Sequence, residues 1–206
     1  MADDATGETN TLDLRKNSEW SFREMLRFAI VAALIVIPIR FFIAEPYLVR
    51  QTSMVPTFLN NDYLVVEKIS YRFSEPERGD VIIFRSPIEN RRTLIKRIVG
   101  LPGETIEIDG NRTVIKYSGG SATLKEPYVK NFAANFSGTY TLKADEYFMM
   151  GDNRAGSYDS RSWGPIERKD IIGRPFLRLY HFDFIGFWPG MRILPESYPR
   201  TSNLEK

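Results

Sequence analysis

Thr93-Leu94-Ile95-Lys96-Arg97-Ile98-Val99 is the stretch that decides the fold. It is an apolar run rich in β-branched residues, with two cations at its centre, and this composition favours a strand. Asp109-Gly110-Asn111 predicts a hairpin turn between two further runs of this kind. The sequence therefore predicts a mainly β domain with few helices, built from an antiparallel sheet whose other expected strands are 63–68, 80–84, 105–108, 113–117, 146–150 and 171–180.

The composition limits the chemistry that the chain can carry out. Its 206 residues suffice for one compact domain with a short appendage. The 28 basic and 26 acidic residues give a net charge of +2, so no nucleic-acid partner is expected. The absence of cysteine excludes disulfides, thiolate metal sites and a thiol nucleophile. With His181 as the only histidine, a Ser-His-Asp triad would depend on that one residue, whereas a Ser-Lys pair needs no histidine.

An apolar run near the N-terminus predicts a membrane anchor. Arg40 is the only charged residue within 28–44, and as a helix this run would be about 25 Å long, near the lower limit for a bilayer core of roughly 30 Å. Basic residues are more frequent before the run than directly after it, which places the N-terminus in the cytoplasm. We therefore predict a polar cytoplasmic leader over 1–24, a transmembrane helix over 25–44 and an extracytoplasmic β-rich domain over 45–206.

Two alternatives to a membrane span stay open. Pro38 and Arg40 would also suit a buried or interfacial helix. A cleaved signal peptide is the other alternative, although Ile43-Ala44-Glu45-Pro46 offers no small-x-small cleavage site. Within the β domain, residues 118–143 are interrupted by glycine and asparagine, and we expect them to form a peripheral excursion between two parts of the core.

Ser53 and Lys96 are candidates for a nucleophile and its base. Pro46 and Pro56 keep the segment around Ser53 from forming a regular helix, so this serine could be presented at an exposed bend. Aliphatic residues flank Lys96, and desolvation can lower the pKa of a lysine by a few units from about 10.4, which makes it a base for a hydroxyl. Alternation along the strand predicts that either Lys96 or Arg97 faces the apolar side. The simpler interpretations are a serine that forms a turn and an edge-strand lysine that deters aggregation.

A polar loop follows the strand predicted at 146–150. It contains two aspartates, two arginines and two serines, which could form a metal site, a phosphate nest or a salt-bridged support for an active site. The arginines would repel a metal ion, so no metal is expected. A hydroxyl from this loop could orient a lysine amine. The loop is Gly151-Asp152-Asn153-Arg154-Ala155-Gly156-Ser157-Tyr158-Asp159-Ser160-Arg161.

Taken together, these segments resemble the bacterial type I signal peptidases, the membrane-bound serine proteases that remove signal peptides from exported proteins. The resemblance runs in order from Phe28 to Gly173. After the anchor and Glu45-Pro46, it is carried by Ser53-Met54-x-Pro56-Thr57 with Asp62 and Val66-Glu67-Lys68; Arg78-Gly79-Asp80-Val81-Ile82-Ile83-Phe84; Ile95-Lys96-Arg97-Ile98-Val99-Gly100-Leu101-Pro102-Gly103; and Gly151-Asp152-Asn153-Arg154-x-x-Ser157-x-Asp159-Ser160-Arg161 with Trp163-Gly164.

The resemblance implies a role for each matching residue. Ser53 would be the nucleophile, Lys96 the general base and Ser157 the hydroxyl that orients the lysine, with Asp159 and Arg161 as paired supports. A signal peptide with small residues at the first and third positions before the cut would add as an extended strand between 47–51 and 93–95. The side chains expected to contact it are Val49, Arg50, Gln51, Met54, Phe58, Leu94 and Ile95.

The same resemblance implies the surroundings of the enzyme. No cofactor is required, and the expected location is the bacterial plasma membrane, with the catalytic domain on the extracytoplasmic side. Signal peptides of exported preproteins and the lipid bilayer are the expected partners, with a protein translocation channel as a further candidate.

One departure concerns the oxyanion hole. Family members usually have Pro-Ser-x-Ser-Met, in which the first serine donates to the oxyanion, whereas this chain has Arg50-Gln51-Thr52-Ser53-Met54. The backbone N–H of Ser53 is still available, and the longer Gln51 amide is an uncertain second donor. Losing one such donor typically costs about 100- to 1000-fold in rate. A slow or substrate-restricted paralogue, or a non-catalytic membrane-tethered binder of exported chains, is therefore an alternative.

Overall fold

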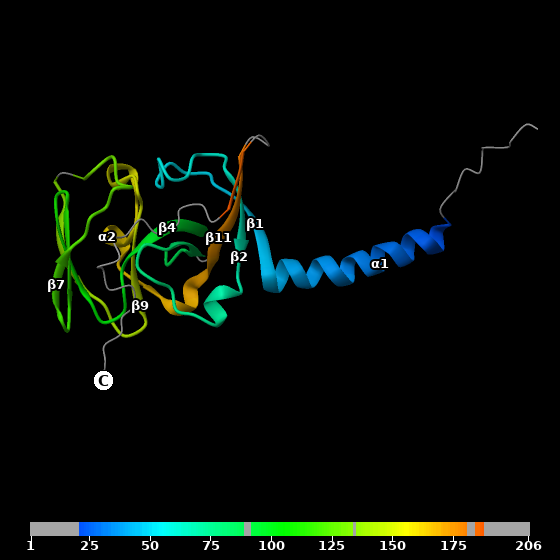
Figure 1. Ribbon diagram of the computed structural model, residues 1–206, viewed down its shortest axis with the longest axis horizontal. Helices are drawn as coiled ribbons and strands as arrows, with labels where there is room; N and C mark the ends of the chain where they lie inside the picture. Colours follow the sequence, from blue (N-terminus) through cyan, green and yellow to red (C-terminus); the bar gives the residue numbers. More distant parts are fainter. Residues whose placement is uncertain (1–20, 89–91, 134, 181–183, 188–206) are drawn as a thin grey trace, which may run out of the picture. The chain divides into compact units, whose positions relative to one another are not determined.

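The computed structural model describes residues 21–88, 92–133, 135–180 and 184–187 (Figure 1). Most of the predicted leader and His181 lie outside these residues. The chain divides into two units, Met1–Pro38 and Ile39–Lys206, which are described separately.

The first unit contains one helix, α1, at Phe22–Pro38. The Glu24 carboxylate accepts a hydrogen bond from the backbone N–H of Ser21 at 2.9 Å, as in a capping box. The helix has no buried residue, although it is largely apolar. Within the described segments, no helix combines the length and hydropathy that a bilayer crossing requires. The span predicted over 25–44 corresponds to most of α1, a π-helical turn at Ile39–Ile43 and Ala44.

The second unit is built from two antiparallel sheets, which confirms the predicted mainly β fold. The larger sheet has the strand order β1-β2-β11-β3-β4-β9-β10, and β12 pairs with β11. Its strands are β1 (Ala44–Leu48), β2 (Tyr63–Glu67), β3 (Val81–Arg85), β4 (Thr93–Gly100), β9 (Glu146–Met150), β10 (Ile166–Glu167), β11 (Ile171–Tyr180) and β12 (Phe184–Phe187).

The smaller sheet has the order β7-β6-β5-β8. Asp109 and Arg112 face each other across the predicted hairpin turn, and Gly110 has φ 57°, a left-handed conformation that glycine adopts without a Cβ clash. The strands of this sheet are β5 (Thr105–Asp109), β6 (Arg112–Tyr117), β7 (Gly120–Thr123) and β8 (Ser137–Thr141).

Residues 118–143 are more closely integrated than the excursion expected from the sequence. They contribute β7 and β8 to the smaller sheet, and Tyr128, Val129 and Leu142 are buried. Their short, polar strands carry little apolar alternation, which is why the sequence pattern did not reveal them.

Strand β4 lies where three apolar clusters meet. Leu94 and Ile98 belong to a cluster with Phe84 and Met149, whereas Ile95 packs with Met54 and Phe58. Val99 joins a third cluster on the smaller sheet. From Leu94 to Gly100 every residue of β4 is buried, so both of its faces are covered.

Candidate active site

Ser53 lies in the tight segment between β1 and β2. Backbone hydrogen bonds close the base of this segment, from Val49 N to Asp62 O at 2.9 Å and from Asn61 N to Val49 O at 2.7 Å. Met54 and Phe58 are fully buried and anchor the segment to the core. Ser53 is therefore held in a defined position and is only 5% exposed.

Lys96 extends from the centre of β4 to Ser53. Its Nζ lies 2.6 Å from Ser53 Oγ and 3.1 Å from the carbonyl oxygen of Ile95, both within hydrogen-bond distance. The lysine is 1% exposed. Two residues far apart in sequence thus form one buried contact.

Burial changes the acidity of this lysine. The pKa of Lys96 is lowered from 10.5 to about 8, chiefly by desolvation. The negative charge of Asp159 opposes this shift, the positive charge of Arg92 adds to it, and Asp152 opposes it. With a pKa of about 8, roughly one lysine in ten is neutral at pH 7, against about one in a few thousand for an unperturbed side chain. The lysine is therefore suited to accept a proton near neutral pH.

Asp159 and Arg161 form a rigid support at the start of the short helix α2 (Ser160–Trp163). The guanidinium of Arg161 donates to both carboxylate oxygens of Asp159 at 2.8 Å, a bidentate pair. Asp159 also accepts a hydrogen bond from Gly151 N at 3.0 Å, and Arg161 donates to the carbonyl oxygen of Arg154 at 2.7 Å. The pair therefore fixes the 151–154 loop next to Ser53.

Ser157 lies beside this loop, but its hydroxyl contacts neither Lys96 nor any other hydrogen-bond partner in the part of the chain that the structure describes. The orienting bond expected from Ser157 to the lysine is thus not formed here, and the Ile95 carbonyl takes that position. A Cβ added to Gly151 would lie 2.3 Å from Ser157 Oγ and 2.5 Å from Ser53 O. Only glycine at 151 allows the two serine segments to approach this closely.

Asn153 links the same loop by hydrogen bonds to the segment between β1 and β2 that holds Ser53. Its backbone N–H donates to Ser53 O at 3.0 Å, and its side-chain amide donates to Thr52 O at 3.2 Å. Together with the Asp159–Gly151 bond, these contacts join the loop to the segment that holds Ser53. The loop also contains the Arg161–Asp159 salt bridge, so its geometry favours the salt-bridged support among the three possibilities that the sequence left open.

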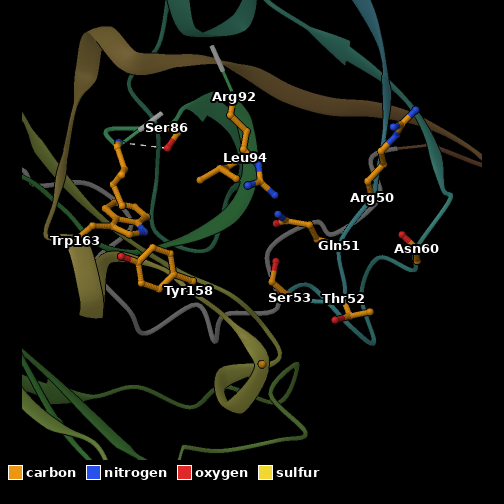
Figure 2. A pocket seen from close by; sticks show the side chains of 12 residues that line it. Arg50, Gln51, Thr52, Ser53, Asn60, Ser86, Arg92, Leu94, Tyr158 and Trp163 are labelled. Carbon is orange, nitrogen blue, oxygen red and sulfur yellow. Dashed lines mark hydrogen bonds between the residues drawn. The ribbon is translucent and has the colours of Figure 1, made fainter. Parts of the chain in front are cut away.

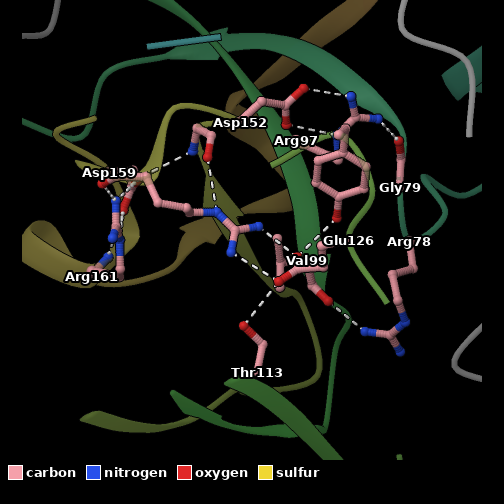
Figure 3. Close-up of polar contacts among 12 residues, drawn as sticks. Arg78, Gly79, Arg97, Val99, Thr113, Glu126, Asp152, Asp159 and Arg161 are labelled. Carbon is pink, nitrogen blue, oxygen red and sulfur yellow. Dashed lines mark hydrogen bonds and ion pairs between the residues drawn. The ribbon is translucent and has the colours of Figure 1, made fainter. Parts of the chain in front are cut away.

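The sequence did not reveal the second buried ion pair beside the site. Arg97 donates to Asp152 through Nε at 2.8 Å and Nη2 at 2.7 Å, and through Nη1 to Gly79 O at 2.8 Å (Figure 3). Its guanidinium carbon lies 4.0 Å from the centre of the Tyr128 ring. Both Arg97 and Asp152 are 0% exposed. Lys96 and Arg97 are therefore both buried, on opposite faces of β4, where the alternation pattern predicted one apolar side.

The 118–143 segment contributes to this network through Glu126. Glu126 binds the guanidinium of Arg154, with Nη1 donating at 2.9 Å and Nη2 at 2.5 Å. Arg154 Nε also donates to Gly151 O at 2.9 Å. Burial raises the pKa of Glu126 and the adjacent Arg154 lowers it, with a net lowering that keeps the carboxylate ionised. Glu126, which lies in the connection between β7 and β8, thus supports Gly151 and its neighbours through Arg154.

An open cleft of about 530 Å³ leads to Ser53 (Figure 2). The aromatic side chains of Tyr158 and Trp163 lie on one side of Ser53, and Arg50 and Asn60 on the other (Figure 2). The described residues that line it are Arg50, Gln51, Thr52, Ser53, Asn60, Ser86, Ile88, Arg92, Leu94, Gly156, Tyr158 and Trp163.

Four of the expected substrate contacts do not line the cleft. Val49, Met54, Phe58 and Ile95 are at most 3% exposed and pack in one apolar cluster beneath the floor of the cleft. Ile95 follows Leu94 in β4, and neighbouring residues of a strand point to opposite sides. Met54 and Phe58 lie in the turns after Ser53, where their side chains anchor the segment in the core. Arg50, Gln51 and Leu94 do line the cleft, and their contact with substrate stays a prediction.

The model of the family described as signal peptidase, peptidase S26, matches residues 22–180. The chain belongs to this signal peptidase family.

Individual signal peptidases are similar over most of their length. A signal peptidase I from Leptolyngbya laminosa is 38% identical over 171 residues, covering 79% of this chain and 78% of the relative. A signal peptidase I V from Bacillus subtilis is 33% identical over 158 residues, covering 70% of this chain and 90% of the relative. A crystal structure of a signal peptidase I from Enterococcus faecalis is 31% identical, with a TM-score of 0.42, and covers 49% of this chain and 97% of that chain.

Membership in the signal peptidase family settles the class of reaction. The chain is a serine peptidase that cleaves signal peptides, and signal-peptide-bearing preproteins are its substrates.

Proposed function

We propose that this signal peptidase uses Ser53 as its nucleophile and Lys96 as its general base, with no cofactor. The observation that carries this proposal is the buried 2.6 Å contact between Lys96 Nζ and Ser53 Oγ at the floor of the cleft. A nucleophile and a base within hydrogen-bond reach are the geometric requirement for activating a hydroxyl.

The reaction follows from the protonation state of the lysine. When Lys96 is an ammonium ion, Nζ donates to Ser53 Oγ and the serine is not activated. When Lys96 is neutral, its lone pair accepts the hydroxyl proton while Oγ attacks the carbonyl of the last signal-peptide residue. The ammonium then returns the proton to the leaving amine. Water, activated in the same way, hydrolyses the acyl-enzyme.

The oxyanion that forms on the substrate carbonyl needs hydrogen-bond donors beside Ser53. The backbone N–H of Ser53 is one candidate, and the Gln51 side chain, which lines the cleft, is the other. Asp159 and Arg161 act as positioning residues, because they hold the Gly151 loop rather than the reacting atoms. Ser157 is a further candidate for orienting the lysine once substrate is bound.

The substrate is proposed to bind as an extended strand between segments 47–51 and 93–95. Tyr47 OH donates to Thr93 O at 2.9 Å, so these two segments are fixed relative to each other. Leu94 and Trp163 give this cleft an apolar wall suited to small aliphatic side chains. Small side chains at the first and third substrate positions before the scissile bond can pack against this wall.

Cleavage of a fluorogenic Ala-x-Ala peptide between pH 6 and 10 tests the mechanism. Since the active base is neutral Lys96, kcat/KM should rise with pH and level off above an apparent pKa of about 8. Ser53→Ala is the matched inactive variant. A rate that still increases tenfold per pH unit between pH 9 and 10 would show that the base is not a lysine with a lowered pKa. No cleavage at any pH would favour a restricted paralogue or a non-catalytic binder shaped by Arg50 and Gln51.

We also propose that the N-terminal segment anchors the enzyme at the bacterial plasma membrane as a single pass, with its N-terminus in the cytoplasm. The apolar side chains along α1 support this, because none of the described residues of the helix is buried within its own unit. A periplasm-dependent reporter fused after Lys206 should be active, and one that works only in the cytoplasm should be inactive. The reverse pattern would overturn the orientation. Retention in the membrane pellet after a high-pH wash checks the anchor itself.

A further inference from the structure

Asn153 holds the two backbone carbonyl groups on either side of the Ser53 N–H and Cα. Its own backbone N–H donates to Ser53 O at 3.0 Å, and its side-chain Nδ2 donates to Thr52 O at 3.2 Å. Val55 N also donates to Thr52 O at 3.2 Å, but this bond closes a turn within the same segment. Asn153 therefore supplies a link that fixes both peptide groups relative to the loop after β9.

The Thr52–Ser53 peptide group carries the proposed backbone donor to the oxyanion. This peptide bond is trans, so the group is planar and its C=O and N–H point in opposite directions. A hydrogen bond that fixes Thr52 O therefore also fixes the direction of the Ser53 N–H. Among the residues that the structure describes, none accepts a hydrogen bond from this N–H. It can therefore donate to a substrate oxygen.

A second asparagine fixes the orientation of the Asn153 amide. Asn131 lies in the connection between β7 and β8, and its Nδ2 donates to Asn153 Oδ1 at 3.2 Å. A backbone carbonyl such as Thr52 O can only accept, so the Asn153 nitrogen faces Thr52 and the Asn153 oxygen faces Asn131. The Asn131 carbonyl also accepts from Ala155 N at 3.1 Å, which holds Asn131 beside the loop. The two amides thus form a hydrogen-bonded chain that ends at the Ser53 segment.

We infer that Asn153 is a positioning residue for the oxyanion hole, and that Asn131 acts through it by orienting its amide. The inference rests on the proposed function and adds residues that direct the Ser53 N–H. Donors stabilise the charge that develops on the carbonyl oxygen only when they already point at it. The other candidate donor, the Gln51 amide, is carried by a long side chain with several rotatable bonds. The backbone N–H is therefore the donor whose direction the fold can fix.

The first test compares Asn153→Ala with the wild-type enzyme on an Ala-x-Ala peptide at the pH plateau. An oxyanion donor acts mainly in the transition state, so kcat should fall about 10- to 100-fold while KM changes by less than about threefold. The midpoint of the pH profile should not move, because the substitution neither adds nor removes charge. Asn111→Ala is the matched control, since Asn111 is exposed in the hairpin turn between β5 and β6 and should leave kcat within about twofold.

A peptide aldehyde ending in Ala-x-alaninal tests the oxyanion hole directly. Ser53 Oγ adds to the aldehyde carbon, Lys96 takes the hydroxyl proton, and the electron pair of the C=O π bond moves to oxygen, which then occupies the proposed oxyanion site. Asn153→Ala should weaken inhibition by about the same factor as it lowers kcat. An uncleaved substrate peptide should bind equally well, within about threefold, to Ser53→Ala and to Ser53→Ala/Asn153→Ala.

Asn131→Ala supplies a second, milder variant. Asn131 is exposed and bonds to the loop rather than to the Ser53 segment, so its loss should lower kcat only about two- to fivefold. The Asn131→Ala/Asn153→Ala double variant should be no slower than Asn153→Ala, because Asn131 acts through the Asn153 amide. Losses that add in the double variant would overturn the role of Asn131.

The outcomes separate the inference from the proposed function. A folded Asn153→Ala enzyme whose kcat lies within about threefold of wild type overturns the inference and leaves the Ser-Lys mechanism in place. A loss that appears in KM alone, or a fall in kcat with unchanged aldehyde inhibition, also overturns it. If circular dichroism shows that Asn153→Ala does not fold, the same two measurements on Asn131→Ala decide. A wild-type enzyme that cleaves no peptide, or a Ser53→Ala variant that still cleaves, contradicts the proposed function itself.

Discussion

Lys96→Ala is expected to lower kcat/KM for a signal-peptide substrate by roughly four orders of magnitude or more. The variant removes the group that lies 2.6 Å from Ser53 Oγ and takes its proton, so the hydroxyl is left without a base. Ser53→Ala should cause a loss of similar size. The Ser53→Ala/Lys96→Ala double variant should be no less active than either single variant, because the two residues act as a unit.

Lys116→Ala is the matched control for this experiment. Lys116 is half exposed on β6 and pairs with Glu107 at the surface, so its loss should leave kcat/KM within about twofold. Circular dichroism and thermal unfolding of each variant distinguish loss of the base from loss of the fold. A folded Lys96→Ala enzyme with more than about one per cent of wild-type activity would contradict the assignment of Lys96.

Asp152→Ala is expected to lower the free energy of unfolding by about 3 to 5 kcal/mol. The variant leaves Arg97, which is 0% exposed, as a buried charge without its bidentate partner. Thr57 Oγ1 also loses its hydrogen bond of 2.5 Å to Asp152. Urea unfolding followed by tryptophan fluorescence measures the change through the shift in midpoint.

Two companion variants make this result specific. Glu167→Ala removes a surface ion pair with Lys169, in which both side chains are largely exposed, and should cost less than about 1 kcal/mol. The Arg97→Met/Asp152→Leu double variant should recover much of the stability lost in Asp152→Ala, because no charge is then stranded. Equal midpoints for Asp152→Ala and Glu167→Ala would show that the buried pair does not stabilise the domain.

The main strands could be predicted because they leave local signals, whereas the pairing of Ser53 with Lys96 was implied by the resemblance to signal peptidases. Apolar runs between glycine and proline mark strands, and a lysine within such a run stands out. Arg97 was not assigned because the alternation rule assumes that one face of a strand is exposed, whereas β4 is covered on both faces. Its partner Asp152 lies 55 residues further along the chain, and no local pattern connects the two.

The lining of the cleft was harder to predict for a similar reason. The resemblance to signal peptidases suggested contacts from Val49, Met54, Phe58 and Ile95, but these four side chains are buried in one apolar cluster. Tyr158 and Trp163 come from the loop after β9 and from α2, and the folded chain brings them to the opposite side of Ser53 from Arg50 (Figure 2). Such contributions depend on tertiary structure.

The long sequence separations within the site have a consequence for how the enzyme matures. β3 and β4 are neighbours along the chain, but Lys96 meets Ser53 across 43 residues and Arg97 meets Asp152 across 55. Contacts that close long loops form later than local ones, because their entropic cost precedes the gain from the contact. With the proposed Ser53–Lys96 pair as its catalytic centre, a newly synthesised chain can act as a protease only after this long-range contact has closed.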